Sequence, residues 1–424
     1  MTRRRRILLV LLCAAIALLI AGRWLSRPQS VAAIVTSRLG ASLGLEIKAA
    51  GTAQYQLRGT PMLVLRDVTV REPKAAKPLL TARRIHVSLP WSTLRAGGKD
   101  LVARRIELDA PHLDLPALQH WLATRPPSEK RLPTLTDGLR IRDGAIDNND
   151  WRIDGIQADM PVLDRKHPLR ARLRGRYVDA PLSIPVDLAV AIMHPEALIK
   201  AGTTGFAAHG RISIERGRDW RLPATVQLSG PLRFGADDLR IAPARLGMAA
   251  RLETATTQLP FALGLHGPLR FDEATWTLGP AGLALRPRED GEDNPLPSLD
   301  AHGSLALGRK LTLHLDGALA HWPRAWPALP PPLGQSRSSL PFALRYDGAP
   351  GLGDEATLQL HRDATQFSGR FRLPRVLAWI EAKQGSPLPP LSGRLTTPVM
   401  EVSGATLEGV EVEMSDVEMS DEAP

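Results

Sequence analysis

Apolar and polar residues alternate along most of this chain, and this alternation constrains its fold more than any other feature of the sequence. In RRIHVSL (83–89) the apolar residues fall at every second position, and LTLHL (311–315) and FALRY (342–346) follow the same rule. Successive side chains of a β-strand point to opposite faces of the sheet, so this period predicts strands with one apolar and one wet face. The chain is therefore expected to be mainly β.

Glycine and proline are concentrated in the breaks between the alternating runs, and the chain has 35 and 37 of them. Both residues interrupt helices and populate turns, which argues against an all-helical protein. Asp-Gly and Gly-Pro steps predict hairpin turns and divide the chain into about 20 strands. Short helices are expected at residues 116–123 and 374–382, where proline stands at a first helical position. The steps interpreted as turns are Asp137-Gly138, Asp143-Gly144, Asp154-Gly155, Gly267-Pro268 and Asp316-Gly317.

The amino-terminal segment predicts a membrane anchor. Four arginines at positions 3–6 precede an unbroken apolar run over residues 7–21. Continued to Leu25, this run would form a helix about 28 Å long, which is close to the thickness of a bilayer core. The arginines place the amino end in the cytoplasm by the positive-inside rule, and the rest of the chain outside it. The anchor residues expected in the bilayer and at its interface are Ile7, Leu12, Ile16, Ile20 and Trp24.

Cleavage is the alternative for this segment, because Ala15-Ile16-Ala17 has the small-x-small pattern of a signal-peptidase site. An uncleaved anchor is the preferred interpretation, since cleavage there would leave an apolar mature end. Helical spacing of apolar residues over 31–44 predicts a short amphipathic helix after the anchor.

Four segments are expected along the chain: the arginine cluster and anchor (1–27), an amino-terminal region (28–123), a continuing β-rich region (124–410) and an acidic tail (411–424). Connections rich in proline or charge are expected at 124–136, 286–298 and 323–339. LPFAL occurs at 259–263 and again at 340–344, which suggests a loosely repeated pair of strands.

The motifs of known catalytic and nucleotide-binding sites do not occur in the sequence. The single cysteine, Cys13, excludes an internal disulfide and a cysteine-based zinc site. His112 and Asp114 would share one face of a strand and could form an acid–base pair or two metal ligands, but a solvated polar face is the preferred interpretation. The acidic cluster at 289–293 lacks the spacing of a calcium loop. No enzyme activity, catalytic residue, metal or cofactor is therefore expected.

The net charge of +10 raises the question of nucleic-acid binding. The arginines are spread over strand faces, and no basic run is interleaved with aromatic residues that could stack on bases. We therefore expect no nucleic-acid partner. Basic residues near a membrane are better suited to anionic lipid headgroups or acidic polymers.

Residues 46–122 resemble the amino-terminal region of the AsmA-like family. The resemblance rests on a strand at 63–70 that ends in Asp-Val-x-apolar, a strand at 82–89, a short segment at 91–98 that ends in glycine, and a strand at 106–115 with a central proline. The segment at 139–160 resembles the strand, Asp-Gly and strand repeat of the family. The middle of the chain, residues 195–330, has no such likeness.

This resemblance implies a protein anchored in the inner membrane of a Gram-negative bacterium, with the bulk of the chain in the periplasm. The amino-terminal region of the family is chorein-like and akin to bridge-type lipid transfer proteins. Larger members are implicated in phospholipid traffic to the outer membrane and in envelope integrity, and some relatives belong to secretion machinery. The partners implied are phospholipid, the inner membrane and a periplasmic or outer-membrane protein.

The alternation of apolar and polar residues also favours a lipid-binding groove, without reference to the AsmA-like family. A sheet with one apolar face must cover that face or curl around something apolar, and few helices are available to cover it. We expect an elongated, curved antiparallel sheet whose groove holds acyl chains. The residues expected to line it are Leu63, Leu65, Ile85, Val87, Leu89, Ile106 and Leu108. A closed β core explains the same alternation and would favour a structural or assembly subunit with a partner on an edge strand; a hydrolase is a third, weaker alternative.

Overall fold

The structure is a computed structural model that describes residues 36–415. Gaps in this description lie at 38–39, 42, 57–58, 96–101, 125–131, 236–237, 256, 289–293, 325, 327–328, 330–332, 335, 337, 382–389 and 403–404. The predicted membrane helix, with Ile7, Leu12, Ile16, Ile20 and Trp24, lies outside the described residues, as do most of the predicted helix at 31–44 and residues 416–424. Within the described part of the chain, no helix is both long and apolar enough to cross a bilayer.

The prediction of a mainly β protein is confirmed, and the chain divides into two compact units, residues 1–199 and 200–424. The boundary expected between 28–123 and 124–410 falls within the first unit. The last strand runs to Met414, so the first four residues of the expected tail (411–414) belong to a strand.

The first unit contains a mixed sheet. Its strands are β1 (Glu46–Ala49), β2 (Gln54–Gln56), β3 (Met62–Arg71), β4 (Leu80–Ser88), β6 (Arg105–Asp109), β7 (His112–Asp114), β9 (Leu139–Asp147), β10 (Arg152–Met160), β11 (Leu169–Asp179) and β12 (Leu182–Ile192). Strand β3 pairs with both β1 and β2 and also with β4. Strand β4 pairs in turn with β6 and β7. Strands β9, β10, β11 and β12 each pair antiparallel with the next one. A separate pair is formed by β5 (Val102–Ala103) and β8 (Thr134–Leu135).

The prediction of a purely antiparallel sheet is wrong at one place, because β6 and β7 both run parallel to β9. Between β7 and β9 lies α4 (Leu115–Ala123), and such a crossover returns the chain in the same direction. The helix confirms the prediction at 116–123: proline stands in its first turn, and the side chain of Asp114 accepts a hydrogen bond from the Ala117 amide at 2.9 Å. Two further helices of this unit have described bounds, α3 (Trp91–Arg95) and α5 (Glu196–Ile199). Residues 36–37, 40–41 and 43, within the predicted helix at 31–44, are also helical.

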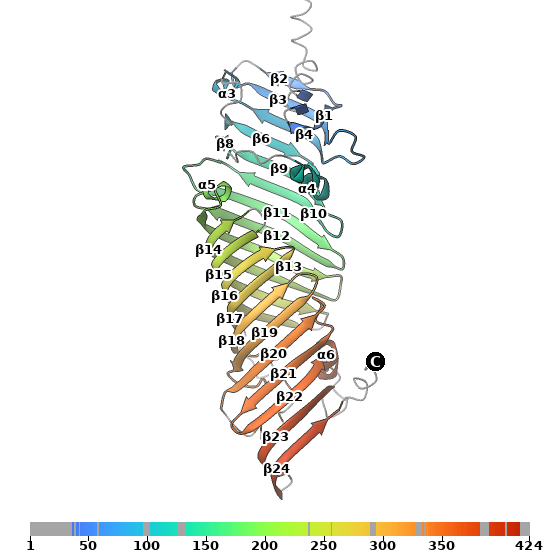
Figure 1. Cartoon of the computed structure of the whole chain (residues 1–424), viewed down its shortest axis with the longest axis vertical. Coiled ribbons are helices and arrows are strands. Elements are labelled where there is room, and N and C mark those ends of the chain that lie inside the picture. Colours follow the sequence, from blue (N-terminus) through green and yellow to red (C-terminus); the bar gives the residue numbers. More distant parts are fainter. Residues whose placement is uncertain are drawn as a thin grey trace, which may run out of the picture. The chain divides into compact units, whose positions relative to one another are not determined.

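The second unit is built from strands that each pair antiparallel with the next one along the chain (Figure 1). They are β13 (Thr203–Arg216), β14 (Trp220–Phe234), β15 (Asp238–Thr254), β16 (Gln258–Asp272), β17 (Thr275–Pro287), β18 (Leu299–Leu307), β19 (Leu311–Leu319), β20 (Leu340–Gly348), β21 (Glu355–Arg362), β22 (Thr365–Arg372), β23 (Leu391–Val402) and β24 (Ala405–Met414). The helix predicted at 374–382 is confirmed as α6 (Leu373–Glu381).

Four of the five predicted turns are wrong, because the steps lie inside strands. Asp143-Gly144 is in β9, Asp154-Gly155 in β10, Gly267-Pro268 in β16 and Asp316-Gly317 in β19. Only Asp137-Gly138 lies outside a strand. The pairing register shifts beside three of the four steps. At these three places the glycine lies at an irregularity inside a strand and does not end the strand.

The irregularities of four successive strands in the second unit lie opposite one another. The register shifts between Ser229 and Leu232 in β14, Ile241 and Ala244 in β15, His266 and Leu269 in β16, and Leu278 and Ala281 in β17. Each of these steps contains a proline, which has no N–H to give to the ladder. A bulge bends the strand that carries it, so bulges in line bend neighbouring strands at the same level.

Candidate functional site: two faces of the sheet

The pairing register brings six of the seven predicted lining residues onto one face of the first unit. Leu63 pairs with Val87, and Val87 with Ile106; in the next row, Leu65 pairs with Ile85, and Ile85 with Leu108. Directly paired residues point to the same side of a sheet. The second row continues through Ile141, Ala158, Leu173 and Leu188 on β9 to β12.

This face is covered near β3. A buried cluster on this face includes Leu65, and Leu63 and Ile85 pack against it. Leu118 and Trp121 of α4 pack against the same cluster. The indole Nε1 of Trp121 donates a hydrogen bond to the Leu43 carbonyl at 3.1 Å, which holds the helix over the cluster.

Leu89 and Ile106 pack against a second cluster, formed by Ala103, Leu135 and Leu163. Val87 and Leu108 are half-buried and lie in neither cluster. The lining role of the seven residues stays a prediction.

The second unit carries an apolar face that sequence reasoning did not identify as a site. One transverse row runs through Leu228, Leu246, Leu265 and Leu283, and a second through Val226, Met248, Leu263 and Leu285. All eight side chains are half-buried, and the buried clusters of the described residues include no residue of β13 to β17. We call these two rows the apolar rows. The alternation in the sequence indicates which residues share a face of each strand, but only the pairing register shows that the leucines of neighbouring strands lie side by side.

Beyond the apolar rows, the same unit has a closed core. Leu319, Leu333, Leu340, Leu360, Leu395 and Met400 form a buried cluster on β19 to β23 and the segment before β20. The proline-rich connection expected at 323–339 does lie between β19 and β20, and its Leu333 packs against the sheet. The guanidinium of Arg362, itself buried, donates hydrogen bonds to the carbonyls of Leu333 at 2.6 Å and Ser338 at 2.7 Å.

The opposite face of the first unit carries a lattice of charges. Arg84 bonds Glu107 at 2.8 Å and Asp109 at 3.0 Å across β4 and β6. Burial raises the pKa of Glu107, but electrostatic interactions with Arg105, His86, Arg84 and Arg142 together bring it below its usual value.

His86 lies opposite Glu107 in the same lattice. Desolvation lowers the pKa of His86 more than the Glu107 carboxylate raises it, and the nearby arginines Arg84 and Arg105 lower it further. The imidazole is therefore held toward its neutral form.

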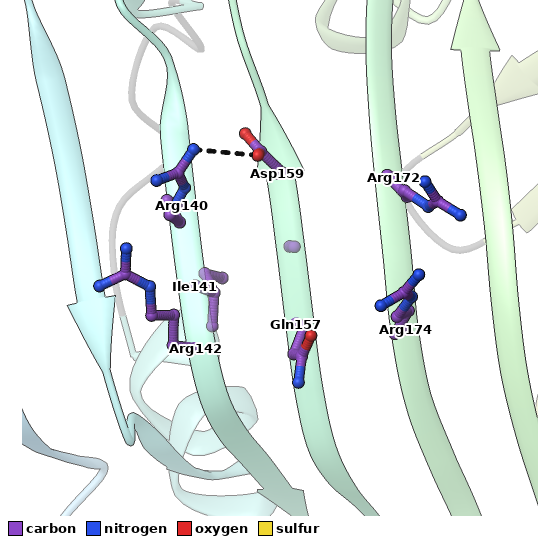
Figure 2. Close-up of a pocket in the computed structure, with 8 residues that line it drawn as sticks. Arg140, Ile141, Arg142, Gln157, Asp159, Arg172 and Arg174 are labelled. Atoms are coloured by element: carbon purple, nitrogen blue, oxygen red, sulfur yellow. Dashed lines mark hydrogen bonds and ion pairs between the residues drawn. The ribbon is translucent and has the colours of Figure 1, made fainter.

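The lattice continues over β9 to β11, where the charged side chains surround a shallow hollow (Figure 2). The hollow has a volume of about 300 Å³ and is lined by Arg140, Ile141, Arg142, Gln157, Ala158, Asp159, Arg172 and Arg174. Sequence reasoning did not single out these residues, because they come from three strands that only the fold brings together.

His112 and Asp114, considered above as an alternative acid–base pair, do not pair with each other. Asp114 caps α4, and His112 Nε2 instead lies 2.7 Å from a carboxylate oxygen of Asp147 on β9. In the part of the chain that the structure describes, no three His, Cys, Asp or Glu side chains are grouped so that they could hold a metal ion. The acidic cluster at 289–293 lies outside the described residues.

Comparison of the chain with models of protein families, with curated proteins and with solved structures gives no match. The likeness of residues 46–122 to the AsmA-like family stays a prediction. The two faces of the sheet are the features from which a function can be argued.

Proposed function

We propose that this protein is a non-enzymatic lipid-handling protein of the AsmA-like type that holds or transfers phospholipid on the apolar face of its second unit. The apolar rows carry this proposal. They place eight large apolar side chains of β14 to β17 side by side and leave each of them partly accessible to solvent. A contiguous apolar surface that stays accessible is typical of a binding surface.

The chemistry of the two faces suits a ligand with an apolar chain and a polar end. The opposite face of these strands carries small residues and some exposed polar ones, such as Arg245, His266 and His302, which share one row. Each methylene group of an acyl chain moved from water onto the leucines contributes about 0.8 kcal/mol. Binding would thus be driven by burial and needs no catalytic group.

The location we propose is the inner membrane, with the sheet in the periplasm and the chain supporting envelope integrity. This part of the proposal rests on the arginine cluster and apolar run at the amino end.

A structural or assembly subunit of an envelope or secretion complex is the second candidate, and β24 favours it. Among the described strands β24 pairs only with β23, and its residues 405–409 are all exposed. An unpaired edge can accept a strand from a partner protein.

Bound lipid in the purified protein is the deciding measurement. The full chain is expressed in bacteria, extracted from the membrane in mild detergent and purified; the protein is then extracted with organic solvent, and phospholipid is quantified per protein. We expect about one or more phospholipids per chain. Leu265→Asp should lower this ratio severalfold, because it places a charge in the first apolar row.

His266→Asp is the matched control, because it introduces the same side chain at the next position of β16, on the opposite and exposed face. It should leave the ratio unchanged, and circular dichroism should show both variants folded. A folded wild type without lipid would refute the proposal and favour the assembly subunit. Equal loss in both variants would assign the lipid to some other part of the surface.

A further inference from the structure

The hollow on the polar face of the first unit has an uneven charge pattern. Its first row is Arg140, Asp159 and Arg172 on β9, β10 and β11, and the carboxylate of Asp159 lies 3.1 Å from the Arg140 guanidinium. In its second row Gln157 pairs with Arg174, and Arg142 of β9 lines the hollow where the register of β9 and β10 shifts at Gln157. Where the first row has a carboxylate between two arginines, the second has a neutral amide.

Neighbouring carboxylates do not make up for this difference, because arginines share them. Asp109 lies 3.8 Å from Arg142 but bonds Arg84 at 3.0 Å, and Asp187 is shared by Arg172 and Arg174 at 3.3 and 3.1 Å. Across β4, β6 and β9 to β12, the ion-paired arginines of this lattice outnumber its carboxylates by seven to five. The arginines are 84, 105, 140, 142, 152, 172 and 174, and the carboxylates are those of residues 107, 109, 154, 159 and 187.

Strand β11 increases the positive charge further. Its arginines at 170, 172, 174 and 176 alternate with other residues and therefore share one face. Arg170 and Arg176 form no ion pair or hydrogen bond with the residues that the structure describes. The hollow thus lies in a surface with more guanidinium charge than carboxylate charge.

Two side chains of the second row have hydrogen-bond donors with no acceptor among the described residues. The side chains of Gln157 and Arg142 make no hydrogen bond with described residues, and Arg142 reaches Asp109 only at 3.8 Å. In Figure 2, Gln157 lies between the arginines of β9 and those of β11. A tetrahedral oxyanion above Gln157 could accept from its amide and from a guanidinium, whose planar fork matches two oxygens of one phosphate.

We propose that this hollow is a phosphate-binding site in which Arg142, Gln157 and Arg174 bind the oxygens of a phosphate group. The group belongs either to a small phosphate in solution or to a lipid headgroup at a membrane surface. The site is on the polar face of the first unit, so the proposal is independent of acyl binding to the apolar rows of the second unit.

Two probes distinguish the sources. Inorganic phosphate is titrated into the full chain at low salt and followed by calorimetry, and sedimentation measures binding to vesicles of phosphatidylcholine with and without phosphatidylglycerol. We expect saturable binding of at least one probe. Binding of inorganic phosphate alone identifies a soluble ligand, and binding of the phosphatidylglycerol vesicles alone identifies a headgroup.

Gln157→Glu is the most informative variant, because it gives the second row the alternating charges of the first without removing an arginine. It should weaken phosphate binding by about tenfold and leave the protein at least as stable. The double variant Arg142→Gln/Arg174→Gln should weaken binding by a similar factor.

The control is Arg345→Gln/Arg394→Gln, which removes the same charge from two exposed strand arginines of the second unit that each pair with a carboxylate. Only the hollow variants should lose affinity. Absence of saturable binding of both probes, or equal losses in the hollow and control variants, would overturn the proposal.

Discussion

Two glycines of β16 provide a direct test of the aligned bulges. Gly267 lies at the bulge with a φ of +150°, and a Cβ added there would be 2.5 Å from the Pro280 carbonyl oxygen and 3.2 Å from the Ala281 Cα on β17. Gly264 lies three residues earlier in the same strand, and a Cβ added there would have nothing within 4 Å. Gly267→Ala and Gly264→Ala are therefore the same chemical change in two different environments.

The expected difference in the free energy of unfolding follows from these contacts. An L-residue at the backbone conformation of Gly267 costs about 1–3 kcal/mol, and the overlap with backbone atoms of β17 adds about 1–3 kcal/mol. Gly264→Ala should instead stabilise by about 0.4–1 kcal/mol, because alanine restricts the unfolded chain. The two variants should thus differ by about 3 kcal/mol or more.

Thermal unfolding of the full chain, followed by far-ultraviolet circular dichroism, checks this expectation. For a unit of this size, about 3 kcal/mol corresponds to a difference in melting temperature of about 6–12 °C. Gly267→Ala should also lower the amount of bound phospholipid if the bend shapes the apolar rows. Equal melting temperatures of the two variants would refute the view that bulges in line set the backbone of β16 and β17.

Three further predictions concern the closed core, the proline-rich segment and the charge lattice. Leu340→Ala should lower the free energy of unfolding by about 2–5 kcal/mol in denaturant titration, because Leu340 is fully buried, and a loss below 1 kcal/mol would contradict the core. Arg362→Ala removes two charge-assisted hydrogen bonds and should speed limited proteolysis within 320–339, whereas the exposed Arg370→Ala should not. Because the pKa of His86 is lowered in the folded protein, stability should fall as the pH drops below about 6.5, and His86→Gln should reduce that fall in titrations from pH 7.5 to 5.

The strands could be predicted from the sequence because burial on one face leaves a local signature. The alternation at 83–89, 311–315 and 342–346 falls in β4, β19 and β20. The two main helices could be predicted for a similar reason, since a first-turn proline and helical spacing are both local.

The pairing of these elements depends on the rest of the chain, and sequence patterns say less about it. The parallel return of β9 beside β6 and β7 depends on the crossover through α4, which no residue of β9 encodes. The prediction of a turn at Gly267-Pro268 in β16 is wrong for a related reason. In a hairpin, glycine and proline end a strand, and in β16 the same dipeptide marks a bulge because β15 and β17 continue to pair on both sides of it.

The candidate sites were harder to predict than the fold, because they depend on register. The sequence of β11 shows arginines at every second position, and this is enough to predict one charged face. It does not show that Arg172 pairs with Asp159 whereas Arg174 pairs with Gln157. A slip of one residue between β10 and β11 would turn the arginines to the other face, and a slip of two would place Asp159 beside Arg174 and Gln157 beside Arg176. The distinction between a neutralised surface and a phosphate site therefore depends on the pairing register of β10 and β11, which includes the apolar pair Ala158 and Leu173 on the opposite face.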